Sequence, residues 1–391
     1  MKTLLVRLIC SVLSFLIPTQ KKLLLFGSWY GNKYGDNPRY FFEWHLKNTD
    51  YQCYWITKNS DVYKELKAKN INVLYGNSLK AIWYHLRAKA VFCNCSVNTD
   101  LFGNYLNRKT IIFNLWHGTP IKKIGFDAIS SDISSERLGV KRSGFISRNT
   151  PNFIKIIKNK LLDKELYYLA SSTKVAAILS SAMGADVNHI IVAGYPKLDH
   201  LIQEVKQPIK GSILYAPTYR GEYNSENDLL TMFGFDPEKM NQWLTEHDKN
   251  LTIRLHPANT LPESLQLEIA KMDRLSLGGD KDLYEEITEY EMVITDFSSL
   301  YYDAVSVNIK TIMAPFGLES YLNEDRQLYF QPEELFPYNM ADNWSELMVF
   351  LPQYFSSEFD LSSIKQKFYV DENGNASEDL WQKLKPIFTR K

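Results

Sequence analysis

The chain has 391 residues, 45% of them hydrophobic and 23% charged, so it can bury a core in each of two domains. The formal net charge is zero, and this excludes attraction to nucleic acid by the field of the whole protein. The four cysteines form no CxxC pair, and a chain of this length needs no disulfides, so we predict reduced thiols in a cytosolic compartment.

The first predicted element is an N-terminal helix within residues 1–20. Its apolar run of about 14 residues is broken by Arg7, whereas a membrane-spanning helix needs roughly 20, and no small-residue cleavage site follows. This pattern predicts an amphipathic helix in the interface of an anionic membrane; the alternative is a first helix packed on the domain. Its narrow polar stripe comprises Thr3, Arg7, Cys10, Ser11 and Ser14.

The next part of the chain alternates between strand and helix patterns. Buried strands alternating with amphipathic helices are typical of a parallel, doubly wound sheet, so residues 21–197 are predicted to form a Rossmann-like domain. The predicted strands cover 22–28, 51–57, 71–76, 90–96 and 109–116, and the predicted helices cover 37–48, 61–70 and 78–89.

A second set of strand patterns follows a hinge region at about 190–202. We therefore predict a second Rossmann-like domain over 198–391, facing the first across a cleft. From about residue 342 the pattern is helical, and part of it is expected to cross back to the first domain. The second set of predicted strands covers 212–218, 250–257, 274–278 and 291–296.

Residues 141–162 differ in composition from the rest of the chain. They contain six Lys or Arg and no acidic residue, with aromatic residues and isoleucines interleaved. This predicts a second membrane contact or a path for a polyanionic acceptor. The alternative is a solvated face of a helix and loop.

Polar residues follow four predicted strands at the point where each strand ends. In parallel sheets, ligands bind at the carboxyl ends of the strands. We therefore predict a single site from these four groups, which are 117–119, 219–220, 256–257 and 296–299.

His117 is the predicted general base. It follows a buried strand, and Gly118 lets a ligand approach the backbone closely. Thr119 before Pro120 is predicted to cap a helix. Asp127 is the nearest acidic residue in this sequence, although no aspartate can be ranked as its orienting partner. The alternative for His117 is a structural residue of a capped turn.

Ser298 and Ser299 are predicted to bind phosphate. They open a helix, where free N–H groups and the helix dipole favour an anion. The alternative is that Asp296 or Ser298 is only the N-cap. Arg220 and His256 also follow strands, and the His256 imidazole could donate to a phosphoryl oxygen.

No metal or cofactor site is predicted. The chain has no HExxH, no paired Cys/His spacing and no GxSxG. Glycines at 27, 31 and 35 do not form the dinucleotide fingerprint, so a nicotinamide cofactor is not expected.

Five stretches in this order resemble the CDP-glycerol glycerophosphotransferases of teichoic-acid synthesis. They are NLWHGTPIKKIGFD, AGYPKLDHL, YAPTYR, RLHP and ITDFSSLYYD, and the likeness extends over about residues 24–318. YGDNPRYFFE near the start is also similar. The resemblance implies a GT-B-like fold at the cytoplasmic face of the cell membrane. It implies transfer of glycerol phosphate or another polyol phosphate from CDP-glycerol or CDP-ribitol to a lipid-linked saccharide or polyol-phosphate acceptor, with release of CMP.

The resemblance also assigns roles to residues. It implies that His117 is the base, and that His256, Arg220, Ser298 and Ser299 lie at the donor phosphates. Lys197, which belongs to the predicted substrate site, stands where an arginine is expected, and a lysine is a point charge without a bidentate fork. Gly118, Thr119 and Asp296 complete the predicted substrate site. The chain length suits a compact primase-type or capsule-type member.

Two other functions are compatible with these patterns. One is a nucleotide-sugar glycosyltransferase of the same architecture, which would release UDP or GDP in place of CMP. The other is a membrane-docked binding protein without turnover. The polyol, the acceptor, the number of units added and the oligomeric state are left open by the sequence.

Overall fold

The computed structural model describes residues 2–129, 164–204, 206–218, 220, 225–226, 228–255, 259–279, 282–369 and 373–389. The basic segment 141–162 and His256 lie outside the described residues, so the predictions made for them are left as predictions.

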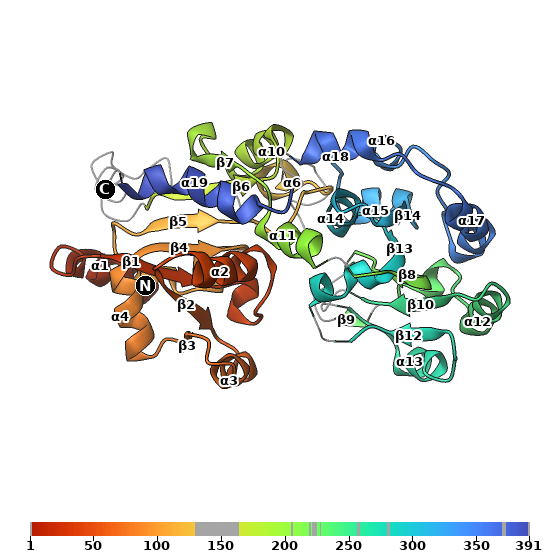
Figure 1. The fold of residues 1–391 in the computed structure, drawn as a ribbon, viewed down its shortest axis with the longest axis horizontal. Coiled ribbons are helices and arrows are strands. Elements are labelled where there is room, and N and C mark those ends of the chain that lie inside the picture. Colours follow the sequence, from red (N-terminus) through yellow and green to blue (C-terminus); the bar gives the residue numbers. More distant parts are fainter. Residues whose placement is uncertain are drawn as a thin grey trace.

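The first lobe is built on a seven-stranded parallel sheet, in the order β3-β2-β1-β4-β5-β6-β7 (Figure 1). All five strands predicted in this half are present, whereas β6 and β7 were not predicted. The strands are β1 (Gln20–Phe26), β2 (Gln52–Thr57), β3 (Val73–Tyr75), β4 (Ala88–Cys93), β5 (Ile111–Asn114), β6 (Leu166–Ala170) and β7 (Ile190–Val192). The helices include α2 (Asp36–Asn48), α3 (Ser60–Ala68), α4 (Leu79–Arg87), α5 (Val97–Asp100) and α10 (Thr173–Met183).

Stacked phenylalanines from neighbouring strands form the centre of the first core. Phe92 stacks on Phe26 at 4.6 Å and on Phe113 at 5.2 Å between ring centroids. All three rings are buried. These strands are buried on both faces, which explains why their sequences are nearly continuous apolar runs.

The second lobe is built on a five-stranded parallel sheet, in the order β12-β10-β8-β13-β14. The four predicted strands are present, and β14 was not predicted. The strands are β8 (Ile209–Tyr215), β10 (Asn250–Ile253), β12 (Leu275–Leu277), β13 (Tyr290–Thr295) and β14 (Lys310–Met313). A separate pair joins β9 (Ser225–Glu226) to β11 (Asn259–Thr260). The helices include α12 (Pro237–Glu246), α13 (Glu263–Ile269), α14 (Leu300–Ser306) and α15 (Leu318–Glu324).

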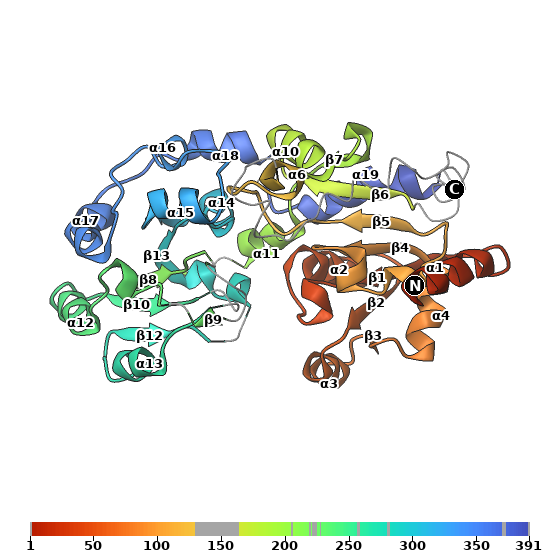
Figure 2. The ribbon, with the colours of Figure 1, turned by 180° about the vertical axis from the view of Figure 1, so that it is seen from behind.

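Helix α11 (Pro196–Gln203) lies between the two lobes in both views (Figures 1 and 2). The last helices are α16 (Pro332–Leu335), α17 (Trp344–Ser356), α18 (Ser362–Phe368) and α19 (Ala376–Thr389).

Helix α19 returns to the first lobe, as the sequence led us to expect for part of the C-terminal region. Its Trp381 packs edge-on against His45 of α2, with 4.7 Å between ring centroids. Asp199 of α11 accepts hydrogen bonds from the backbone N–H groups of Ala376 and Ser377 at 2.6 and 2.8 Å. The chain end therefore fixes α11 to the first lobe.

Helix α1 (Lys2–Leu13) packs through small polar residues and leaves large apolar ones outside. Cys10, Ser11 and Ser14 of the predicted polar stripe are buried. The side chains on the outer side are exposed, namely Ile9 at 50%, Val12 at 63%, Phe15 at 64% and Leu16 at 79%. Within the described part of the chain, no helix has the length and apolar character needed to cross a bilayer.

Candidate active site

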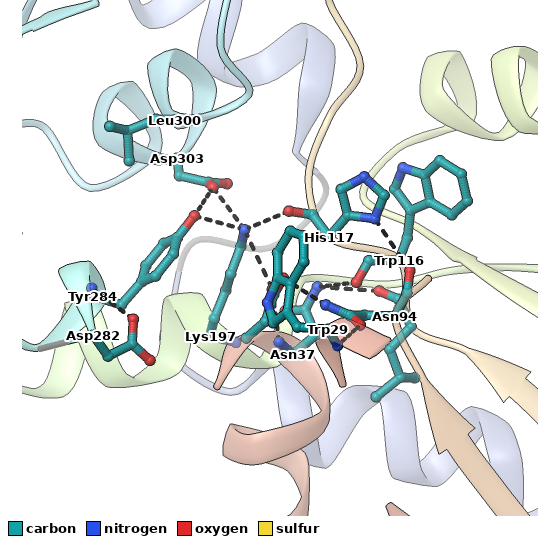
Figure 3. Close-up of polar contacts among 12 residues, drawn as sticks. Trp29, Asn37, Asn94, Trp116, His117, Lys197, Asp282, Tyr284, Leu300 and Asp303 are labelled. Atoms are coloured by element: carbon teal, nitrogen blue, oxygen red, sulfur yellow. Dashed lines mark hydrogen bonds and ion pairs between the residues drawn. The ribbon is translucent and has the colours of Figure 1, made fainter. Parts of the chain in front are cut away.

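His117 lies three residues after the end of β5, and its ring has a defined tautomer. Nδ1 is 3.1 Å from the backbone carbonyl oxygen of Asn94 (Figure 3). A carbonyl can only accept, so Nδ1 carries the proton and Nε2 is the basic nitrogen. The rings of Trp116 and Trp29 lie 4.7 and 5.6 Å from the imidazole, between centroids.

The surroundings of His117 keep its imidazole neutral. Burial lowers its pKa, and the nearby cations of Lys197 and Lys122 lower it further. The Asn94 carbonyl and the Asp100 carboxylate oppose this shift without reversing it. A general base must be unprotonated at the working pH, so the direction of the shift suits that role.

The His117 loop is held by two asparagines that the sequence analysis did not select. The Asn94 side chain donates to Asp36 Oδ2 at 2.9 Å and accepts from the Trp29 N–H at 3.0 Å. The Asn37 amide donates to the carbonyls of residues 115 and 116, each at 3.1 Å. Asp36-Asn37 lies in the YGDNPRYFFE stretch, so Asn37 had a detectable signal in the sequence. Asn94 had none, because the predicted strand 90–96 extended beyond it, whereas β4 ends at Cys93.

Thr119 has a different position from the one predicted. The prediction that it caps a helix at Pro120 was wrong, because the next helix, α6 (Gly125–Ile129), begins later. The intervening loop pairs with the second lobe, through Lys123 N–H to the Gln327 carbonyl and Tyr329 N–H to the Ile121 carbonyl, both at 2.8 Å. Thr119 is fully buried, with Oγ1 3.1 Å from the hydroxyl of Ser171.

Asp127 has other partners than His117. Its carboxylate accepts from the hydroxyls of Ser181 and Tyr329, each at 2.6 Å. It therefore joins α10 to the second lobe. The orienting group for the imidazole is the Asn94 carbonyl described above.

In the second lobe, the partly exposed Arg220 pairs with the buried carboxylate of Asp296. Arg220 Nη2 is 3.0 Å from Asp296 Oδ2 and 2.7 Å from the Phe316 carbonyl. The other Asp296 oxygen accepts from the Thr218 N–H at 2.6 Å. This pairing fixes the arginine at the carboxyl end of the second sheet, as predicted for a ligand site in a parallel sheet.

Ser298 and Ser299 stand at the start of α14, as predicted. Ser298 Oγ accepts from the N–H of Leu300 at 3.3 Å, and Ser299 is the N-cap residue but makes no side-chain cap bond. Both serines are partly exposed. Their hydroxyls therefore remain available to a ligand.

Gly118 brings the two lobes into contact. A Cβ atom on this glycine would lie 2.7 Å from both Cβ and Oγ of Ser299, and its φ is +149°. The histidine loop of the first lobe thus touches the helix start of the second. Any side chain at this position would separate them.

Lys197 is fully buried at the same place. Its Nζ lies 2.7 Å from Asp303 Oδ2, 2.8 Å from the Tyr284 hydroxyl and 3.0 Å from the His117 carbonyl (Figure 3). Asp36 Oδ1 is 3.7 Å away. The structure therefore places Lys197 among carboxylates and a carbonyl.

Lys122 is a residue that the sequence analysis did not select, although it lies in the HGTPIKK stretch. It belongs to the first-lobe loop that pairs with residue 328. Burial lowers its pKa to about 8, with opposing contributions from acidic and basic residues that include Asp296 and Arg220 of the second lobe. Lys122 is therefore a cation from the first lobe in the electrostatic range of the predicted donor site.

Among the described residues, no group of three or more His, Cys, Asp or Glu is arranged to hold a metal ion. Of the predicted site residues, the structure brings His117, Gly118, Lys197 and Ser299 together. Arg220 and Asp296 form a neighbouring pair, and Thr119 lies deeper in the first lobe.

Two parallel α/β sheets, with the loop that carries His117 in contact with a serine-bearing helix start, are an arrangement typical of a group-transfer enzyme. The chain belongs to the CDP-glycerol:poly(glycerophosphate) glycerophosphotransferase family, whose model matches residues 9–385.

The chain is similar to several curated proteins along most of its length. It is 26% identical over 390 residues to the teichoic acid glycerol-phosphate transferase of Staphylococcus aureus (strain NCTC 8325 / PS 47), covering 93% of both proteins. It is 24% identical over 412 residues to the teichoic acid poly(glycerol phosphate) polymerase of Bacillus spizizenii (strain ATCC 23059 / NRRL B-14472 / W23), covering 98% of this chain and 97% of the relative.

Solved structures share the fold. The wall teichoic acid polymerase TagF superposes with a TM-score of 0.68 at 22% identity, covering 95% of this chain and 90% of the other. A UDP-GlcNAc 2-epimerase from Neisseria meningitidis superposes with a TM-score of 0.52 at 10% identity, covering 95% and 100%. At these identities the likeness concerns the fold alone.

Proposed function

We propose that this enzyme transfers glycerol phosphate from CDP-glycerol to a hydroxyl of a lipid-linked acceptor, with His117 as general base and CMP as leaving group. The observation that carries the proposal is the contact between Gly118 and Ser299. It puts the histidine loop beside the helix start that is suited to phosphate. A base and an anion site in one place are what phosphoryl transfer requires.

The proposed step is an in-line displacement. The acceptor oxygen forms a bond to the β-phosphorus of CDP-glycerol, and the bond from that phosphorus to the bridging oxygen breaks. CMP leaves with the electron pair, and His117 Nε2 takes the proton of the acceptor hydroxyl. Positioning and charge stabilisation supply most of the catalysis in such a transfer.

The donor site is proposed on the second lobe. The Ser298 and Ser299 hydroxyls and the start of α14 would bind the phosphate that is transferred. Arg220, fixed by Asp296, would supply positive charge, and His256 is proposed to donate to a phosphoryl oxygen. Charge-assisted bonds of this kind are the stronger class of hydrogen bonds.

The two lobes are proposed to be the Rossmann-like halves of a GT-B-like fold, over 21–197 and 198–391, with acceptor and donor on opposite sides of the cleft. Two parallel sheets, with a contact between Gly118 after β5 and Ser299 after β13, support this arrangement. Helix α19 is the exception to this division, because it packs on the first lobe.

The enzyme is also proposed to attach to the cytoplasmic face of the membrane through its N-terminal helix and the basic segment 141–162. Helix α1 buries Cys10 and Ser11 and exposes Ile9 and Val12, and the turn that follows it exposes Phe15 and Leu16. Outward apolar residues on an N-terminal helix suit an interfacial position beside a lipid-linked acceptor. The basic segment 141–162 is the proposed second contact with anionic lipid.

Product analysis tests the proposed function. The protein is incubated with CDP-glycerol or CDP-ribitol and a lipid-linked saccharide acceptor, and the released nucleotide is identified. Release of CMP with growth of the acceptor supports the proposal, and the preferred donor identifies the polyol. In parallel incubations with UDP- and GDP-sugars, release of UDP or GDP would support the glycosyltransferase alternative. Nucleotide binding without turnover would support a binding protein.

The same assay with EDTA tests the predicted absence of a metal requirement. The chain contains an Asp-x-Asp spacing at Asp280 and Asp282, and carboxylates are ligands for divalent cations such as Mg²⁺. In the structure, the Asp282 carboxylate lies 3.4 Å from Arg39 Nη1. Loss of turnover that Mg²⁺ restores would establish a metal site.

A further inference from the structure

A buried lysine connects the parts of the site that come from different lobes. Lys197 is the second residue of α11, the helix between the lobes, and its side chain has no exposure to solvent. Its backbone N–H donates to the Asn37 side chain of α2 at 3.2 Å. The residue is therefore fixed to the first lobe at its backbone, while its ammonium group reaches the second.

All three N–H directions of the ammonium group are used within the protein. They point to Asp303 Oδ2, the Tyr284 hydroxyl and the His117 carbonyl, at 2.7, 2.8 and 3.0 Å. An ammonium group has three donors and no more. Lys197 would have to give up one of these bonds to bind a phosphate.

Its partners belong to the elements that must be aligned for the reaction. Asp303 is in α14, the helix that Ser299 begins, and it also accepts from the hydroxyls of Tyr284 and Tyr369 at 2.5 and 3.0 Å. The other partner is the carbonyl of the proposed base. The lysine therefore joins the base loop directly to the phosphate-binding helix.

The electrostatics favour a permanently charged lysine. Burial alone would lower its pKa, but the carboxylates of Asp303 and Asp36 raise it above the ordinary value. The cation in turn lowers the pKa of His117, after the larger effect of burial. Asp100 raises that pKa, and Lys122 lowers it.

We infer that Lys197 is a positioning residue, whose ammonium group fixes the His117 loop of the first lobe in register with the Ser299 end of α14 through Asp303. This inference rests on the proposed function and replaces the substrate contact expected for Lys197 from the sequence. This role explains why a buried charged side chain lies where the two lobes are in contact. If the proposed base is misplaced by about 1 Å relative to the phosphate, the rate can fall roughly 10²-fold.

The test compares four full-length variants by turnover and by calorimetric binding of CDP-glycerol. Lys197→Met removes the cation. The double variant Lys197→Met/Asp303→Asn also removes the carboxylate charge that the single variant leaves unpaired, so the double variant can still fold if the single variant does not. Lys197→Arg keeps the charge. Lys206→Met is the control, because Lys206 follows the same helix but is 48% exposed and pairs with Glu289 on the surface.

The expected result is a loss of kcat of roughly 10²-fold in Lys197→Met and in Lys197→Met/Asp303→Asn, with the dissociation constant for CDP-glycerol within threefold of the parent. The acid limb of the pH profile of kcat should move to higher pH, because the cation that lowers the His117 pKa is gone. Lys197→Arg should recover much of kcat and leave the acid limb in place. Lys206→Met should behave as the parent.

Two results would overturn the inference. Weaker CDP-glycerol binding of tenfold or more, with kcat retained at saturation, would make Lys197 a donor contact. A double variant with lowered thermal stability but unchanged kcat and pH profile would make it a structural residue only. Failure of the proposed function looks different, because the parent protein itself would then bind or turn over no CDP-polyol.

Discussion

Gly118 and Ser299 are in direct backbone-to-side-chain contact across the two lobes, with no space for a Cβ atom between them. This contact joins the loop of the proposed base to the start of the proposed phosphate helix. In-line attack requires the acceptor hydroxyl and the donor phosphorus to be held at the correct distance, and this distance depends on how closely the loop and the helix approach each other.

Gly118→Ala should therefore impair turnover more than stability. The new methyl group meets Ser299 at 2.7 Å, so the lobes must separate or the loop must shift. We expect kcat to fall roughly 10²-fold and the free energy of unfolding to fall by about 1–3 kcal/mol. Gly234→Ala is the matched control, because its φ is also positive, at +79°, but nothing lies within 4 Å. If both variants keep full activity, the contact has no role in alignment.

His117→Ala should remove most turnover and leave donor binding largely intact. A general base contributes roughly 10²–10⁴-fold, and the imidazole belongs to the lobe opposite the proposed donor site. Initial rates and calorimetry with CDP-glycerol measure the two effects separately. His247→Ala, which changes an exposed histidine of the second lobe, should have no effect on either. Activity of His117→Ala within a few-fold of the parent contradicts the assignment.

Lys122→Met should weaken CDP-glycerol binding by roughly 10–100-fold, the value of one charge-assisted hydrogen bond. Since the pKa of Lys122 is lowered to about 8, it loses its charge as the pH rises through that value. Donor affinity of the parent should therefore decline above pH 8, and this decline should be absent in the variant. Lys123→Met is the control from the next position. Equal effects of the two substitutions would point to a loop defect in place of a phosphate contact.

Asp36→Asn should change how stability depends on pH. Burial raises the pKa of Asp36 from 3.8 to about 6, against the opposing effect of Lys197. The folded protein therefore holds this proton more tightly than the unfolded chain. This contribution to the free energy of unfolding is about 3 kcal/mol. It is complete below pH 3.8 and is lost as the pH rises through about 6.

The asparagine variant keeps a neutral side chain at all pH values. The parent loses this stabilisation between about pH 4 and pH 7, whereas the variant has no such loss. The free energy of unfolding of the variant minus that of the parent, measured by urea unfolding, should therefore rise by the same amount over this range. Asparagine also tolerates the positive φ of +62° at this position. The control is Asp61→Asn, whose side chain is 83% exposed and should give a flat difference. A flat difference for Asp36→Asn as well would mean that its pKa is ordinary.

Helix α1 should attach the protein to anionic liposomes. Replacing Ile9, Val12, Phe15 and Leu16 with glutamine removes apolar area worth roughly 25 cal/mol per Å² and should shift the protein to the supernatant at high salt. At low salt the basic segment 141–162 should retain part of it, at about 1 kcal/mol per basic residue. Met232→Gln/Val349→Gln, which changes two exposed apolar residues elsewhere, is the control. Parent protein that stays in the supernatant at low salt would leave α1 as a packed first helix.

The sequence by itself determined the elements and the chemistry of the strand ends. Apolar runs that alternate with amphipathic helices identified nine strands of the two parallel sheets, because strands buried on both faces must be continuously apolar. Strand ends in parallel sheets are ligand sites, so His117, Arg220, Ser298 and Ser299 could be selected without coordinates. Strands β6, β7 and β14 were not recognised, since short apolar runs do not distinguish a strand from a buried helix.

Only the tertiary structure decided what these residues do to one another. Pro120 suggested a helix start by local rules, but pairing of residues 121–123 with residues 327–329 gave that backbone other partners. Nothing in the sequence near Lys197 indicates that Asp303 and the His117 carbonyl would enclose it. The groups that form hydrogen bonds and ion pairs between the lobes come within contact distance only when both sheets have folded and packed together. Local sequence patterns carry no information about those distances.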